Sequence, residues 1–111
     1  MDLINELQNL TKQLSNSLKQ LRANGIKLAE AEKKYKIAVN RKALLLRSED
    51  MPVTLINQVI YGYYDIAQLR FLRDSAEVVY NANQEAINTL KLQIRIVENQ
   101  IKREYGNDLY N

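Results

Sequence analysis

The sequence contains no cysteine and no histidine, and among its 111 residues only one is proline and three are glycine. Without cysteine, neither a disulfide nor a thiolate metal site can form. Without histidine, the commonest general base and a frequent metal ligand are both missing. Because helix breakers are so few, the composition favours long helices.

Long hydrophobic runs are also missing from the sequence. Apolar stretches such as Ala43–Leu46 fall far short of the roughly 20 residues that span a bilayer, so we expect no membrane segment. The chain opens on amphipathic sequence, without a basic region ahead of an apolar core, so we also expect no secretory leader. Both expectations favour a cytoplasmic protein.

Apolar residues recur at alternating steps of four and three from Leu3 to Leu45, and again from Ile66 to Ile101. Such heptad seams are typical of coiled coils and of helices in bundles. The sequence therefore predicts two long helices, over about 2–47 and about 63–105. We expect a frayed tail over 106–111, because Gly106 is a C-terminal stop signal.

The segment between the two seams contains the single proline, Pro52. The residue before a proline is disfavoured in the helical region, so the first helix should end near residues 47–49. Ser48 or Asp50 is a suitable N-cap, and Pro52 suits the first turn of a short helix over about 52–61. The predicted fold is all-α: one domain, residues 1–111, forming an antiparallel coiled-coil-like helical hairpin with a short connecting helix.

Two long helices and one short helix cannot bury a deep core by themselves, so we expect the hairpin to form a homodimer with a four-helix bundle. Asn24 and Asn83 occupy seam positions at similar distances from the bend. One hypothesis is that they approach each other and set the register, as buried polar seam residues can. In the alternative, each faces solvent at a gap in the core.

Apolar and aromatic residues off the seams form a candidate partner or oligomer surface. Exposed apolar patches usually mark contacts with another molecule. In the alternative, the short helix folds back over Phe71 and covers it. The residues of this candidate surface are Tyr61, Tyr63, Tyr64, Phe71 and Val78, of which the last two lie one heptad apart.

Charge is distributed unevenly along the chain. Residues 1–47 hold ten Lys and Arg against four Asp and Glu, whereas residues 48–111 hold six against nine. Lys27, Lys34 and Arg41 recur every seven residues on one flank of the first seam and form a candidate basic contact row. This row suits nucleic-acid phosphates or an acidic protein surface. The alternative is a solvated face that pairs with acids of the other half.

The sequence offers no recognisable catalytic, cofactor-binding or metal site. Gly25, Gly62 and Gly106 are too far apart for a phosphate-binding loop. The carboxylates Glu30 and Glu32 point in different directions on a helix, so they cannot act as a pair. We therefore expect a protein that is not an enzyme and needs no cofactor.

Three stretches of the sequence carry a family resemblance, beginning at Met1, Met51 and Leu69: MDLINELQNLTKQL, MPVTLINQVIYG and LRFLRDSAEVVYNANQEAINTLKLQIRIVENQIKRE. They resemble small helical accessory proteins encoded by bacteriophages and prophages of Gram-positive bacteria, and the resemblance covers nearly the whole chain. It implies a phage protein in the cytoplasm of a bacterial host cell, from an early region beside recombination and replication functions. It brings no catalytic residues with it.

A small phage protein without catalytic residues usually works through contact, although this is an analogy about its class. We expect a protein partner from the host or the phage, with the chain acting as a modulator or inhibitor of a host or defence enzyme. The alternatives are a nucleic-acid-associated accessory factor of phage recombination or replication, and a self-associating coiled-coil scaffold.

Overall fold

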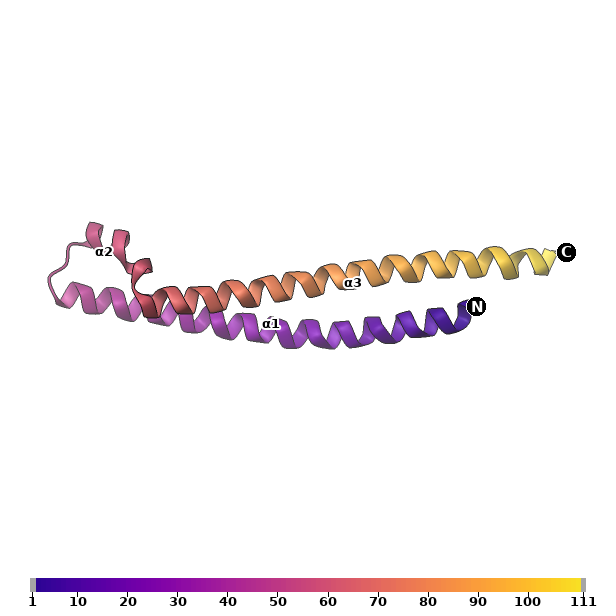
Figure 1. Cartoon of the computed structure of the whole chain (residues 1–111), viewed down its shortest axis with the longest axis horizontal. Helices are drawn as coiled ribbons and strands as arrows, with labels where there is room; N and C mark the ends of the chain where they lie inside the picture. Colours follow the sequence, from indigo (N-terminus) through magenta and orange to yellow (C-terminus); the bar gives the residue numbers. More distant parts are fainter. Residues whose placement is uncertain (1, 111) are drawn as a thin grey trace. The chain divides into compact units, whose positions relative to one another are not determined.

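The computed structural model describes the backbone of residues 2–110 and the side chains of residues 2–106. Nearly all of these residues are helical and none of them lies in a strand, which confirms the predicted all-α class. The elements follow one another as α1 (Leu3–Ser48), α2 (Val53–Val59), the 3₁₀ turn η1 (Ile60–Gly62) and α3 (Tyr64–Tyr110) (Figure 1).

Contacts within the chain divide it into two compact units. Unit 1 consists of residues 1–23 and 81–111, and unit 2 consists of residues 24–80. Each unit contains a segment of α1 and a segment of α3, and unit 2 also contains α2 and η1. The single domain over residues 1–111 that the sequence suggests stays a prediction.

Helix α1 begins with a side-chain cap and continues through its glycine. The Asp2 carboxylate accepts a hydrogen bond of 2.9 Å from the Ile4 N–H, which satisfies one of the free donors of the first turn.

Farther along α1, a Cβ at Gly25 would lie only 3.3 Å from Cε2 of Tyr80 on α3. Gly25 is therefore the residue that admits the tyrosine ring close to the α1 backbone.

Helix α1 ends in a Schellman motif, in which a residue in left-handed conformation closes the last turn. Asp50 has φ 64° and takes the position that glycine usually occupies. The Met51 N–H donates to the Leu46 carbonyl at 3.1 Å, and the Asp50 N–H donates to the Arg47 carbonyl at 3.0 Å. The side chain of Met51 packs against the buried cluster that contains Leu46, and such a hydrophobic contact often accompanies this motif. The effect of Pro52 on the preceding residue predicted the end of α1 near residues 47–49, and α1 ends at Ser48. The interactions that end the helix are those of the Schellman motif.

The predicted N-cap of the short helix is wrong. Pro52 occupies the N-cap position of α2 and makes no side-chain cap hydrogen bond. Ser48 cannot cap α2 because it is the last residue of α1, where its hydroxyl donates to the Leu45 carbonyl. Asp50 cannot cap it because its backbone turns left-handed to close α1.

The core of unit 2 draws residues from every element of that unit. Leu46 of α1, Ile56 of α2 and Ile60 of η1 form one buried cluster, with Tyr63 packed at its side. The short helix therefore packs on the last turns of α1, beside which it lies in Figure 1. Ile66 of α3 is completely buried.

The α1 and α3 segments of unit 2 run antiparallel. The contacts between them pair falling residue numbers on α1 with rising numbers on α3, which is the order that antiparallel helices produce. These contacts join Lys42 to Asp65, Tyr35 to Arg73, and Gly25 to Tyr80.

The core of unit 1 is built mainly on α3. Ile87, Leu90 and Val97 are its buried apolar residues, and Asn83 is buried with them. The side-chain amide of Asn83 donates a hydrogen bond of 3.2 Å to the Ser17 carbonyl on α1. This bond satisfies a polar group that would otherwise destabilise the core.

The predicted end of the last helix near Tyr105 is wrong, because α3 continues through Gly106 to Tyr110. Gly106 does not have a positive φ, so it does not form the left-handed cap that the sequence suggests. A helical glycine costs only about 1 kcal/mol relative to alanine, which is not enough to end the helix. The tail predicted over 106–111 is thus helical as far as residue 110, and Asn111 lies outside the described residues.

Candidate partner-binding groove

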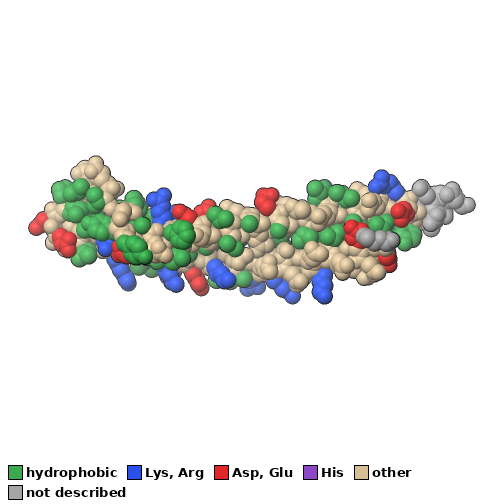
Figure 2. Space-filling model, in the orientation of Figure 1, with side chains coloured by type: hydrophobic (Ala, Val, Ile, Leu, Met, Phe, Trp, Pro, Cys, Tyr) green, Lys and Arg blue, Asp and Glu red, His purple; other side chains and the backbone are tan. Residues whose placement is uncertain are grey.

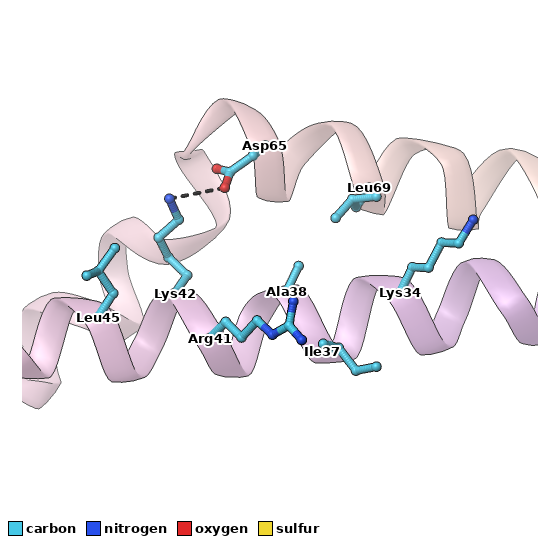
Figure 3. Close-up of a pocket in the computed structure, with 8 residues that line it drawn as sticks. All are labelled: Lys34, Ile37, Ala38, Arg41, Lys42, Leu45, Asp65 and Leu69. Carbon is cyan, nitrogen blue, oxygen red and sulfur yellow. Dashed lines mark ion pairs between the residues drawn. The ribbon is translucent and has the colours of Figure 1, made fainter.

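The three residues of the predicted basic row all lie on α1 within unit 2 and are exposed. Lys34 and Arg41 line a hollow of about 600 Å³ between the α1 and α3 segments of this unit (Figure 3). Lys27 and Lys34 line a second, smaller hollow, and Lys27 lines a third. The row thus follows one side of all three hollows.

The hollows share residues, so they form one groove along unit 2, called the basic groove below. The first and second share Lys34 and Leu69, and the second and third share Lys27. The lining residues on α1 are Asn24, Lys27, Glu30, Ala31, Lys34, Ile37, Ala38, Arg41, Lys42 and Leu45. The lining residues on α3 are Asp65, Leu69, Leu72, Ser75, Ala76 and Val79.

The side of the groove that faces the basic row is largely apolar. Leu72 and Val79 line it from α3, one heptad apart, and they are 48% and 53% exposed. Ala31, Ala38 and Ala76 lie between the two sides and have short side chains, which leaves the groove open. The basic groove is therefore amphipathic across its width.

An ion pair joins the two helices at one end of the groove. Nζ of Lys42 lies 3.1 Å from Oδ2 of Asp65 (Figure 3). The same Nζ lies 4.8 Å from the centre of the Tyr63 ring. The hydrogen bond from Lys42 lowers the pKa of the Asp65 carboxyl, against a smaller opposing effect of burial. The charge of Lys42 is thus balanced within the protein.

The remaining bases of the groove are not balanced in this way. Among residues 2–106, Lys27, Lys34 and Arg41 take part in no ion pair. Glu30 is the one other acid that lines the groove besides Asp65. The sequence also allowed the alternative that the row pairs with acids of the other half of the chain. No such ion pair is present among the described side chains.

The predicted aromatic surface is largely exposed. Tyr64, Phe71 and Val78 are 83%, 62% and 67% exposed, and they recur every seven residues on α3. Tyr61 is about half exposed, whereas Tyr63 packs against the buried cluster of unit 2. Figure 2 shows hydrophobic side chains at the surface around α2 and the start of α3. Phe71 is not covered by the short helix, which packs on Leu46.

The two asparagines of the register hypothesis fall in different units. Asn83 belongs to unit 1 and donates to the Ser17 carbonyl. Asn24 belongs to unit 2 and lines the third hollow of the basic groove. The hypothesis that these side chains meet and set the register stays a prediction.

The described residues contain neither a candidate metal cluster nor a candidate membrane span. No group of three or more His, Cys, Asp or Glu within this part of the chain is placed to hold a metal ion. None of the described helices has a stretch that is both apolar enough and long enough to cross a bilayer.

Comparison with protein-family models, curated proteins and solved structures finds no match to this chain.

Sequence patterns found one side of the groove and missed the other. The seven-residue spacing identified Lys27, Lys34 and Arg41, but a single helix does not reveal which residues of a second helix lie opposite. In the sequence, Leu72 and Val79 lie beside the second seam, and the pattern does not indicate which residues they face. The one further signal was Lys42, a charged residue on a seam where an apolar residue is expected.

Proposed function

We propose that this chain is a non-catalytic interaction protein that binds a protein partner through the basic groove, as a modulator or inhibitor of a host or defence enzyme. The resemblance to phage accessory proteins supports a role in the cytoplasm of a bacterial host. The absence of histidine and cysteine from the sequence supports a role without catalysis.

The observation that carries this proposal is the position of the basic row. Lys27, Lys34 and Arg41 line a groove whose opposite side is apolar, and they have no ion pair among residues 2–106. A surface that combines unpaired charge with exposed apolar side chains suits a folded protein partner. The apolar part contributes buried area, and the charges select partners of opposite sign.

The experiment that tests this function is an affinity capture from the bacterial host with two matched variants. The groove variant carries Lys27→Glu, Lys34→Glu and Arg41→Glu, and the control variant carries Lys12→Glu, Lys19→Glu and Arg22→Glu in unit 1. Both variants change the net charge equally, and all six replaced side chains are exposed. We expect wild type and the control variant to retain a common partner that the groove variant loses by at least tenfold. Equal retention by all three proteins would contradict the proposal.

We also propose that the complete chain closes as an antiparallel hairpin and forms a homodimer with a four-helix core. The antiparallel contacts of unit 2 support the hairpin, and the exposed row of Tyr64, Phe71 and Val78 supports self-association. Light scattering at rising concentration should show a dimer mass that Phe71→Gln with Val78→Gln abolishes. A monomer mass at high concentration would overturn the homodimer, and with it the alternative of a self-associating scaffold.

The second candidate function is binding to nucleic acid, and the basic row itself is the observation that favours it. Phosphate contacts by Lys27, Lys34 and Arg41 would give an affinity that falls steeply with salt. Titration of labelled single- and double-stranded DNA at low and moderate salt tests this function. Absence of binding at low salt removes it, whereas strong DNA binding without a captured protein reverses the order of the two functions.

A further inference from the structure

The spacing of charges along the basic groove matches the repeat of an α-helix. Lys27, Lys34 and Arg41 follow one another at seven residues, which is about 10 Å at a rise of 1.5 Å per residue. A second helix lying along the groove would present side chains of one heptad position at nearly the same interval. Each base could then meet one acid of the incoming helix.

The apolar side of the groove has the same repeat. Leu72 and Val79 are seven residues apart on α3, and Leu69 lies between the two helices. Two helices that leave an apolar furrow along their junction present the surface that a third helix covers in a three-stranded coiled coil. Peptide helices bind protein grooves in this way, with apolar residues at intervals of three and four.

The positive charge of the groove determines that the occupant must carry negative charge. Lys42 is already paired with Asp65, but the three bases of the row have no ion pair among residues 2–106. A helix with acidic residues on the flank toward the row would neutralise these bases. A basic helix would bring like charges together, which is unfavourable.

A nucleic acid fits this surface less well. A DNA duplex carries one phosphate charge per about 1.7 Å of its axis, whereas the groove offers one basic side chain per about 10 Å. The groove would also place Leu72 and Val79 against solvated phosphates, with no gain from their apolar area. The apolar side therefore favours a helix over a phosphate backbone.

A second copy of this chain is not a matching occupant. None of its 13 Asp and Glu residues lies seven residues from another, so no helix of the chain offers an acidic row of the required spacing. The complementary helix must come from a different protein.

We infer that the basic groove receives an amphipathic α-helix of another protein, with acidic residues at seven-residue intervals beside an apolar stripe. This inference rests on the proposed function, because it specifies the partner of the same groove. The incoming helix lies between α1 and α3, with its acids toward Lys27, Lys34 and Arg41 and its apolar residues toward Leu72 and Val79.

Two designed peptides test the inference. Both have four heptads with leucine and isoleucine along one stripe. The acidic peptide carries glutamate at the positions that flank this apolar stripe, and the basic peptide carries lysine at the same positions. Fluorescence anisotropy measures the binding of each labelled peptide to wild type, to the groove variant and to the control variant.

We expect wild type and the control variant to bind the acidic peptide at least tenfold more tightly than the basic peptide. The groove variant should reverse this preference. Leu72→Gln with Val79→Gln should weaken acidic-peptide binding about fivefold or more, while circular dichroism shows unchanged helicity. Equal binding of both peptides by wild type, or an unchanged preference in the groove variant, overturns the inference.

Nuclear magnetic resonance locates the bound peptide. The methyl signals of Ala31, Ala38 and Ala76 should shift on addition of the acidic peptide, because these residues line the groove. The methyl of Ala86, which lines a hollow of unit 1, is the internal control and should not shift. Shifts at Ala86 alone, or tighter binding of labelled DNA than of the acidic peptide, overturn the inference.

This experiment separates the inference from the proposed function. A host protein captured through the row, together with no binding of the acidic peptide, would overturn the helical occupant and leave the interaction function intact. If the acidic peptide binds but no captured host protein depends on the basic row, the helical occupant is supported and the proposed function is overturned.

Discussion

Unit 1 and unit 2 are built from segments of the same two helices, yet their surfaces differ in chemistry. The hollow that α1 and α3 line in unit 1 is uncharged, and most of its side chains are polar. Its residues are Gln13, Asn16, Ser17, Gln20, Ala86, Thr89, Leu90 and Gln93. The groove of unit 2 has bases on one side and apolar residues on the other. The two units thus share a heptad scaffold and differ in the side chains on its flanks.

The cores of the two units differ as well. In unit 1, the buried residues among those described all come from α3, whereas unit 2 buries residues from α1, α2, η1 and α3. The short helix covers the end of α1 in unit 2 and leaves the groove open. Unit 2 therefore combines the better enclosed core with the surface on which charged and apolar residues face each other.

Matched core substitutions should show the largest difference between the units. Ile66→Ala in unit 2 should reduce the free energy of unfolding by about 3–4 kcal/mol, and Ile87→Ala in unit 1 by about 2 kcal/mol. Ile66 is completely buried, whereas Ile87 is 4% exposed and lies in a core to which, among the described residues, only α3 contributes buried ones. Urea unfolding followed by circular dichroism measures both values. A larger loss for Ile87→Ala would contradict the ranking of the two cores.

The end of α1 offers a stabilising substitution in unit 2. Asp50→Gly should raise the free energy of unfolding by up to about 1 kcal/mol, because a left-handed conformation is disfavoured for any residue with a Cβ. Glu49→Gly is the neighbouring control and should not stabilise, since Glu49 has no positive φ. Thermal unfolding measures both, and a lower melting temperature for Asp50→Gly would argue against the Schellman motif.

A pair of glycine substitutions compares the two units at a smaller scale. Gly106→Ala in unit 1 should stabilise α3 by up to about 1 kcal/mol, because a helical alanine is favoured and nothing lies within 4 Å of the new Cβ. Gly25→Ala in unit 2 should give little or no gain, since the methyl would crowd Tyr80 at 3.3 Å. Melting temperatures test the pair, and equal gains would show that the Tyr80 contact does not matter.

Acid should produce the smallest effect. The pKa of Asp65 is lowered in the folded protein, so its pair with Lys42 contributes stability above the unfolded pKa, and this is lost as pH falls through the folded pKa. Asp65 is exposed, so the contribution is small. Between pH 6 and pH 2, wild type should lose slightly more stability than Asp65→Asn. Identical pH profiles would show that the pair contributes nothing.

The helices were predictable because their signals are local. Two heptad seams and one proline predict two long helices with a short helix between them, and the structure contains them. The Schellman motif at Asp50 was not predictable, because aspartate rarely takes the position that glycine favours. The helix end predicted near Gly106 is wrong, because the preference of glycine for a non-helical conformation is weak.

The details of the seam and the groove depend on contacts between helices. The heptad pattern assigns Leu45 to the seam, but Leu45 is half exposed and Leu46 is buried. A straight helix drifts by about 20° per heptad from the seam, and here Ile56 and Ile60 cover Leu46. In the same way, the sequence showed the row of bases but not the leucine and valine that face it.

The most direct test of the basic groove compares two exposed leucines on α3 as sites for a photo-reactive amino acid in host cells. Leu72 lines the groove of unit 2 and is 48% exposed, while Leu92 lies in unit 1 and is 55% exposed. We predict that a probe at position 72 cross-links a partner protein through an acidic helical segment, and that a probe at position 92 does not. Cross-linking of the same partner from position 92 alone, or equally from both positions, would contradict the basic groove as the binding site.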